Sequence, residues 1–388
     1  MHLRRLTLAS FRNYSRLELD LGPGLVLLLG PNAQGKTNLL EAVCLLATAR
    51  SDRAETDADF IAWSVRADPQ PVARVVGAAA RARADVTVEV IVAGRPGAHG
   101  NLVASKRLKL NGVPRRASDV VGAITAVLFT TDDMDLVRGA PSGRRRYLDV
   151  MLSQADHGYL RALQRYTRVV AQRNALLKRL QDRNARTDEL SYWDEELARD
   201  GATLLTARAA AVADLARHAR AAHARLGGES EHFAVAYAPR FSDAWHPERL
   251  ASASAADVAP ALLDRLQATH ARDIAAGVTL TGPHRDDLAM TLGGEPAAAF
   301  ASRGQQRTAA LALRLAEAAL LYARSGERPI LLLDDVLSEL DADRRASVLA
   351  TLDADQVWIT SPDPDRFDAA LLSRAQVWRI DAGTAERA

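Results

Sequence analysis

A glycine-rich turn between an apolar run and a helical pattern constrains the fold more than any other feature of the chain. The turn matches GxxxxGK[ST] and reads Gly30-Pro31-Asn32-Ala33-Gln34-Gly35-Lys36-Thr37. Residues 25–29 before it are apolar, and apolar residues recur at helical spacing from Asn38 onward. Glycines let successive backbone N–H groups face one concavity, and the following helix adds partial positive charge there. The order of strand, loop and helix predicts an α/β fold with a phosphate-binding loop, or P-loop.

The last two residues of this loop indicate which phosphate compound it binds. A lysine at the place of Lys36 reaches the β and γ phosphates of a nucleotide, and the hydroxyl of Thr37 is a ligand for Mg²⁺. We therefore predict that residues 30–37 bind ATP and that Lys36 also takes part in catalysis. The alternative is a glycine-rich turn that binds nothing.

A second motif is an apolar strand that ends in two adjacent carboxylates. Residues 330–333 are Ile-Leu-Leu-Leu, and Asp334 and Asp335 follow them. Hydrolysis of Mg·ATP needs a carboxylate for the metal and often another to orient water. We predict that Asp334 holds Mg²⁺ together with Thr37 and that Asp335 polarises the attacking water. Two acids that merely end a strand are the alternative.

A third segment places small polar residues directly before a helix. Ser302 and Gly304 precede the strongly helical run 309–316, which makes a second anion site at a helix N-terminus. Because Lys36 already accounts for the triphosphate of this chain, we expect the segment to contact the nucleotide of a second subunit.

The length of 388 residues indicates two to three domains. Apolar residues recur at helical spacing from about Tyr147 to Leu226, and strand patterns return from about His232. We predict a parallel-sheet core interrupted by an antiparallel helical hairpin, with boundaries at 1–146, 147–230 and 231–388. Residues 251–260, rich in Ala and Ser, are expected to be a linker, and residues 381–388 a frayed tail.

Composition limits the partners and the compartment. Fifty Lys and Arg residues against 48 Asp and Glu give a net charge of +2, so a surface for nucleic acid has to be local. The single cysteine, Cys44, suits a reducing compartment. No apolar run approaches the ~18 residues that a membrane span requires. We expect a cytoplasmic protein without a membrane partner.

The order of these motifs resembles that of ABC-type ATPases of the SMC kind, and within them the RecF family. The likeness covers nearly the whole chain, and its more specific pieces are Phe11-Arg12-Asn13-Tyr14, residues 159–178, Gly282-Pro283-His284-Arg285-Asp286-Asp287, residues 302–307 and residues 333–341. The resemblance implies an ABC-type ATPase head with a mixed sheet core and an antiparallel lobe, which carries the helical hairpin.

The resemblance also implies a function in recombinational DNA repair and replication, linked to the SOS response. Members form a homodimer around two ATP molecules, hydrolyse ATP slowly, and bind single-stranded gaps and junctions, where RecO and RecR help to load RecA. Carried onto this chain, Ser302, Gly304 and Gln305 would meet the γ-phosphate of the partner. Asp341 would line the dimer seam and could equally cap a helix that begins near Ala342, and Thr360 stands at the switch position.

Two basic clusters are candidates for contacts with DNA phosphates. Their members are Lys106, Arg107, Lys109, Arg115 and Arg116 in the first, and Arg144, Arg145 and Arg146 in the second. A solvated loop and an ordinary helix face are the alternatives. His284 and Arg285 are expected either to line the nucleotide or to support the fold.

Two other functions fit part of the pattern. A transporter-type ATPase subunit would couple to a membrane protein, and a nuclease-linked ATPase would need an acidic metal cluster beyond Asp334 and Asp335. The helical insert and the paired carboxylates favour an ATP-gated DNA-binding dimer over both.

Overall fold

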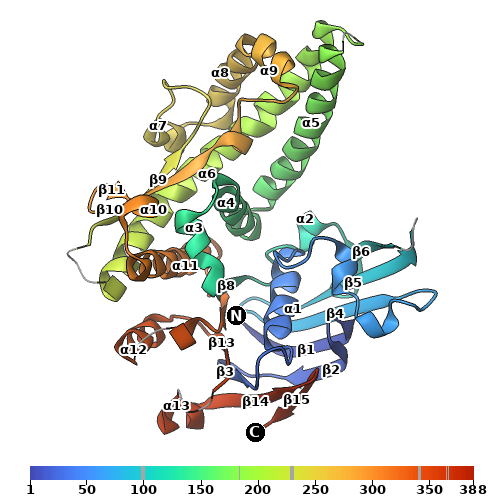
Figure 1. The fold of residues 1–388 in the computed structure, drawn as a ribbon, viewed down its shortest axis with the longest axis vertical. Coiled ribbons are helices and arrows are strands. Elements are labelled where there is room, and N and C mark those ends of the chain that lie inside the picture. Colours follow the sequence, from blue (N-terminus) through green and yellow to red (C-terminus); the bar gives the residue numbers. More distant parts are fainter. Residues whose placement is uncertain (98–100, 183, 228–230, 340–341, 364, 366) are drawn as a thin grey trace. The chain divides into compact units, whose positions relative to one another are not determined.

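The computed structural model describes residues 1–97, 101–182, 184–227, 231–339, 342–363, 365 and 367–388 (Figure 1). Its contacts divide the chain into two compact units. Unit 1 comprises Met1–Asp133 and Glu317–Ala388, and unit 2 comprises Met134–Ala316. The boundaries expected at residues 146 and 230 enclose the helical insert alone, whereas unit 2 also includes strands and helices up to Ala316. That three-part division stays a prediction.

The first sheet of unit 1 is antiparallel and follows the order β2-β1-β4-β5-β6-β7. Its strands are β1 (His2–Phe11), β2 (Tyr14–Asp20), β4 (Val72–Ala80), β5 (Val86–Pro96), β6 (Leu102–Leu110) and β7 (Val113–Arg115). The alternating valines of β5 are all buried, because successive side chains of a strand point to opposite faces. The antiparallel lobe is thereby confirmed.

The second sheet of unit 1 is mixed and has the order β15-β14-β3-β13-β12-β8, in which only β15 runs antiparallel to its neighbour. Its strands are β3 (Gly24–Leu29), β8 (Ala126–Thr130), β12 (Ile330–Asp334), β13 (Gln356–Ser361), β14 (Ala375–Asp381) and β15 (Thr384–Arg387). Helix α1 (Lys36–Thr48) contacts strands of both sheets. Shorter helices of the unit are α2 (Ala117–Val120), α12 (Ala342–Thr351) and α13 (Ala369–Arg374). The predicted parallel core is confirmed.

Unit 2 is built around the long helix α6 (Leu190–Gly227), which packs against α5 (His157–Gln181) as the predicted hairpin (Figure 1). Its other helices are α3 (Met134–Arg138), α4 (Pro141–Ala155), α7 (Pro247–Ser252), α8 (Ala255–Ala268), α9 (His270–Ala276) and α10 (Ala297–Phe300). Strands β9 (Phe233–Ala238), β10 (Asp287–Leu292) and β11 (Glu295–Pro296) form a small sheet. Helix α11 (Arg303–Ser325) begins in unit 2 and ends in unit 1.

Two segments differ from expectation. The expected linker at 251–260 is largely helix, since α8 begins after a capping box of Ser254 and Asp257, and Val258 and Leu262 are buried on one face. Alanine favours helix strongly, so its abundance marks a helix here and not a linker. The expected frayed tail at 381–388 is strand β15, which pairs with β14.

Within the described ranges, every helix is too short or too polar to span a lipid bilayer.

Candidate nucleotide-binding site

The glycine-rich loop joins the carboxyl end of β3 to the start of α1, as the sequence predicts. Gly30 and Gly35 have φ of 153° and 115°, a region that side chains disfavour. A Cβ on Gly30 would lie 2.2 Å from the carbonyl oxygen of Ile380, and one on Gly35 would lie 2.5 Å from Nδ2 of Asn13. Gly30 therefore requires glycine for space as well as for conformation, whereas a side chain at Gly35 would displace the amide of Asn13.

Lys36 is the first residue of α1, and its side chain reaches back to the beginning of the glycine-rich loop. Its side chain is 93% buried, and Nζ donates hydrogen bonds to the carbonyl oxygens of Gly30 at 2.6 Å and Pro31 at 2.8 Å. Burial lowers the pKa of Lys36, while the charges of Asp335 and Asp334 oppose that shift. An ammonium group held by two backbone carbonyls of the loop suits the β and γ phosphates of a nucleotide.

Asp334 is the common acceptor for two hydroxyls, one from the start of helix α1 and one from strand β13. Its Oδ1 accepts from Thr37 Oγ1 at 2.9 Å and from Thr360 Oγ1 at 2.8 Å. Asp334 and Thr360 are direct register partners in β12 and β13, so the parallel sheet places them side by side. Burial raises the pKa of Asp334, and the hydrogen bonds from the two threonines oppose the rise. The structure thus brings together three residues that the sequence assigned to the metal and the switch.

The acidic strand end fits a divalent cation. Asp335 has φ of 55°, and its backbone N donates to Thr360 Oγ1 at 2.9 Å. Its Oδ1 is buried and has no hydrogen-bond partner among the described residues. Carboxylate and hydroxyl oxygens are the donors that Mg²⁺ prefers, so Thr37 and Asp334 suit the metal.

The loop is also held from outside by residues whose role the sequence did not reveal. Tyr14 OH donates to the carbonyl of Gly35 at 3.1 Å, and Asn13 Nδ2 donates to that of Gln34 at 2.9 Å. The turn 382–383 donates two backbone N–H groups to Gln34, at 2.7 Å to Oε1 and 3.2 Å to O. Asn13 and Tyr14 stand in one of the family-like motifs, but no local signal marks the turn.

The Ser302 segment forms a capping box at the start of α11. Gln305 N donates to Ser302 Oγ at 3.3 Å, and Ser302 N donates to Gln305 Oε1 at 2.8 Å. Gly304 lies in the first turn, where its carbonyl accepts from Thr308. Ser302 is exposed. The predicted helix N-terminus is confirmed, and Asp341, expected at the same interface, lies outside the described residues.

The first basic cluster lies on strands β6 and β7, at one edge of the antiparallel sheet, and includes Arg116, the N-cap residue of α2. Three of its members are exposed: Arg107, Arg115 and Arg116. Lys106 Nζ donates to Asp57 at 2.6 Å, and Lys109 Nζ lies 3.3 Å from a carboxylate oxygen of Glu89. The two lysines are engaged in ion pairs, and the three arginines face solvent.

The second basic cluster is divided by burial. Arg144 is 92% buried and pairs with both carboxylate oxygens of Asp287, at 2.6 and 2.9 Å. Its expected contact with DNA is therefore wrong, because the guanidinium faces the interior of unit 2. Arg145 is half-buried and donates to the carbonyl of Asp286 at 2.8 Å, whereas Arg146 is exposed.

His284 and Arg285 support the fold of unit 2. His284 Nδ1 accepts from Tyr166 OH at 2.7 Å, and Nε2 donates to the carbonyl of Thr279 at 3.0 Å. Arg285 donates to the same carbonyl. Burial lowers the pKa of His284 to about 4, so the ring is neutral. Of the two expectations for these residues, the structure supports the second.

Similarity to known proteins is extensive. A family model for the RecF/RecN/SMC N terminal domain matches residues 2–375. A protein of Roseiflexus castenholzii named DNA replication and repair protein RecF is 43% identical over 394 aligned residues, with 99% of each chain covered. The chain belongs to the RecF family. Another RecF-family protein of the same name, from Herpetosiphon aurantiacus, is 41% identical with 99% of each chain covered.

Solved RecF structures share the fold. One is described as the recombination mediator protein RecF-ATPrS in the RecFOR pathway and superposes with a TM-score of 0.85 at 28% identity, covering 100% of this chain and 98% of its own. Another, described as RecF-ATP in the same pathway, gives a TM-score of 0.84 and covers 100% and 97%. The predicted fold class and the RecF resemblance are both confirmed.

Proposed function

We propose that the chain is an ATP-dependent DNA-binding protein of DNA replication and recombinational repair. One observation carries the proposal: Asp334 accepts hydrogen bonds from Thr37 and Thr360 beside a buried lysine at the end of a glycine-rich loop. RecF relatives over the full length are named for DNA replication and repair, and solved relatives are described with ATP. Both facts support the proposal.

At the nucleotide, the residues 30–37 cradle the phosphates, and Lys36 contacts the β and γ groups. Thr37 and Asp334 would hold Mg²⁺, which supplies neutralisation of phosphate charge when it is bound. Asp335 orients and polarises the attacking water through its buried carboxylate. Thr360 contacts both acids, through Asp334 Oδ1 and the backbone N of Asp335, and so serves as the switch.

Dimerisation completes the site. Each subunit holds its own ATP with residues 30–37 and presents Ser302, Gly304 and Gln305 to the γ-phosphate of its partner. The N–H groups and dipole at the start of α11 favour an anion there. ATP then stabilises the dimer by mass action, and slow, DNA-stimulated hydrolysis separates the subunits.

DNA is bound through its backbone. The contacts that we propose are the exposed members of the basic clusters with the half-buried Arg145: Arg107, Arg115, Arg116, Arg145 and Arg146. Gapped and junction DNA are the proposed substrates, and RecO and RecR the proposed partners in loading RecA, with a link to the SOS response. The RecFOR pathway of the solved relatives supports this assignment.

The test is DNA binding with and without ATP at two salt concentrations. Wild-type chain is expected to bind gapped DNA more tightly with ATP, with an affinity that falls as salt rises. Lys36→Arg is expected to lose the ATP effect, and Asp335→Asn to keep ATP binding but slow the turnover that releases DNA. Equal DNA affinity with and without ATP would refute the proposal. An ATPase rate that DNA does not change would favour the alternative function, an ATPase subunit of another ABC complex.

A further inference from the structure

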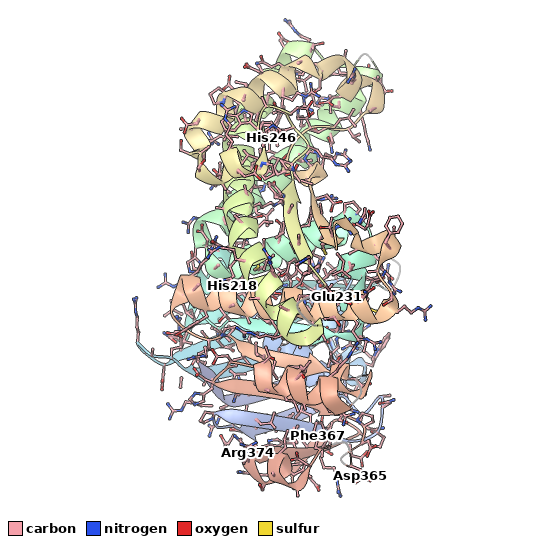
Figure 2. All side chains as sticks on the ribbon, turned by 90° about the vertical axis from the view of Figure 1, so that its left-hand side faces the viewer. His218, Glu231, His246, Asp365, Phe367 and Arg374 are labelled. Atoms are coloured by element: carbon pink, nitrogen blue, oxygen red, sulfur yellow. The ribbon has the colours of Figure 1, made fainter. Side chains whose placement is uncertain are left out.

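A side-chain cluster in unit 2 connects the start of α11 to the segment before β9. Glu231, labelled in Figure 2, accepts a hydrogen bond through Oε1 from Gln305 Nε2 at 2.9 Å. Gln305 Oε1 accepts from the backbone N of Ser302 at 2.8 Å. The amide of Gln305 is therefore held at both ends, by the helix cap on one side and by Glu231 on the other.

The other carboxylate oxygen of Glu231 faces the end of α6. Its Oε2 lies 3.7 Å from Nε2 of His223, a buried ring that stacks on Phe233 with centroids 5.0 Å apart. A Cβ added to Gly227 would lie 3.2 Å from atoms of His223, Glu231 and Thr308. Helix α6, Glu231 and helix α11 are thus packed closely, with the carboxylate hydrogen-bonded to Gln305 on one side and facing the His223 ring on the other.

This arrangement orders the side chain of Gln305 before it contacts the γ-phosphate of the partner's ATP. A glutamine side chain has many rotamers, and ordering it only when the dimer forms would reduce the affinity of the dimer. One N–H of the amide is bound to Glu231, which leaves the second N–H of Nε2 as a donor in a fixed place. Ser302 Oγ is held near it by the same capping box.

We propose that Glu231 is a positioning residue that fixes Gln305 for the γ-phosphate of the partner subunit. The inference rests on the proposed function, because it requires the Ser302 segment to meet ATP across a dimer. Glu231 itself touches no phosphate; it acts through the amide of Gln305.

The test measures ATP-dependent dimerisation of the full chain by light scattering. Glu231→Leu removes both acceptors, and Glu231→Asp withdraws the carboxylate by one methylene. Each is expected to raise the dimer dissociation constant about five- to tenfold. Glu231→Gln keeps a carbonyl acceptor for Gln305 Nε2 and is expected to stay within about twofold of wild type.

Two measurements separate positioning from a general loss of structure. ATP affinity at concentrations where the chain is monomeric is expected to be unchanged in every Glu231 variant. Glu295→Leu, which removes an exposed acid from strand β11 of the same unit, is the matched control and is expected to dimerise as wild type.

A double-mutant cycle gives the decisive result. If Glu231 acts through Gln305, the pair Glu231→Leu/Gln305→Ala is expected to dimerise as weakly as Gln305→Ala alone. Additive losses, a Glu231→Gln variant as weak as Glu231→Leu, or unchanged dimerisation of Glu231→Leu and Glu231→Asp would each overturn the inference. Wild-type chain that stays monomeric with ATP would instead refute the proposed function.

Discussion

Among single residues, Asp334 carries a conflict between stability and function. Its carboxylate is placed where burial disfavours the charge, and two threonine hydroxyls only partly offset that cost. An acid whose pKa is raised by folding destabilises the folded state at neutral pH, and the cost is relieved as the pH falls through the raised pKa. The charge of a bound cation would offset that cost.

Asp334→Asn is accordingly expected to stabilise the chain and to inactivate it. The amide oxygen still accepts from Thr37 and Thr360, but no charge is buried, so the thermal unfolding midpoint without nucleotide is expected to equal or exceed that of wild type. ATP-dependent dimerisation is expected to be lost with the metal ligand. The exposed Asp353→Asn is the control for charge removal. A clear drop in the unfolding midpoint would contradict this account.

His284 makes the stability of unit 2 depend on pH. Both ring nitrogens are used in the neutral form, and the pKa is lowered to about 4. A base with a lowered pKa gives stability that is full above its unfolded pKa and lost as the pH falls toward the folded pKa. Between pH 7 and pH 5 wild type is expected to lose about 2 kcal/mol more of unfolding free energy than His284→Gln. Denaturant titrations at both pH values measure it, and equal losses would exclude the ring as the source.

Among the elements, the hairpin of β14 and β15 takes part in the nucleotide site. Its two-residue turn, Ala382 and Gly383, has positive φ at both positions and donates to Gln34 of the glycine-rich loop. The hairpin of β10 and β11 has the same kind of turn at Gly293 and Gly294, with φ of 61° and 90°. The two turns share the left-handed backbone conformation but not the surroundings.

Gly383→Val is therefore expected to weaken ATP binding about tenfold or more, because its Cβ would lie 2.4 Å from the carbonyl oxygen of Asn13 and displace the support of the loop. Gly294→Val is the matched control, since nothing lies within 4 Å of its Cβ. Both variants are expected to lose similar stability from the left-handed backbone. Nucleotide titration of monomeric chain checks the first effect. Equal ATP affinity in the two variants would remove the turn from the site.

For the molecule as a whole, the two halves of the proposed nucleotide site belong to different units. Residues 30–37 and 330–335 lie in unit 1, and Ser302 caps α11 in unit 2. If two subunits share the site, ATP affinity of the monomer and ATP-dependent dimerisation can be changed separately. Substitutions in residues 30–37 affect the first, and substitutions at Ser302 affect the second.

Ser302→Arg is expected to leave ATP affinity of the monomer within about twofold and to abolish ATP-dependent dimers. A bulky cation at the start of α11 opposes the helix dipole and fills the place of the partner's phosphate. Light scattering with ATP measures dimers, and the exposed Ser191→Arg in α6 is the control. A large loss of monomer affinity would contradict the role in trans.

Replacing Arg107, Arg115 and Arg116 by alanine is expected to weaken DNA binding equally for all sequences and to lower the slope of log affinity against log salt by about 2–3. The matched control removes the exposed Arg4 and Arg5 of β1 and Arg16 of β2, the two strands farthest from β6 and β7 in the same sheet. Fluorescence anisotropy over a salt series measures both slopes. A triple variant with the wild-type slope would place DNA elsewhere.

The local sequence was sufficient to predict those elements whose conformation depends on neighbouring residues in the chain. The loop 30–37, the acidic end of β12 and the helical hairpin were all predicted, because glycine conformation, apolar periodicity and charge at a strand end act within a few residues. The alanine-rich composition of residues 251–260 does not by itself distinguish a linker from the helix α8, and strand β15 is ordered by its pairing with β14, which no local pattern reveals.

The sequence alone determined the phosphate loop, the acidic end of β12 and the helical hairpin. Only tertiary structure decided that Asp334 shares one oxygen between two threonines, that the turn 382–383 supports Gln34, and that Arg144 is buried while Arg107 is exposed. The reason is physical: backbone preference depends on neighbours in the chain, whereas burial, ion pairing and hydrogen bonding depend on residues that the fold brings together from hundreds of positions away.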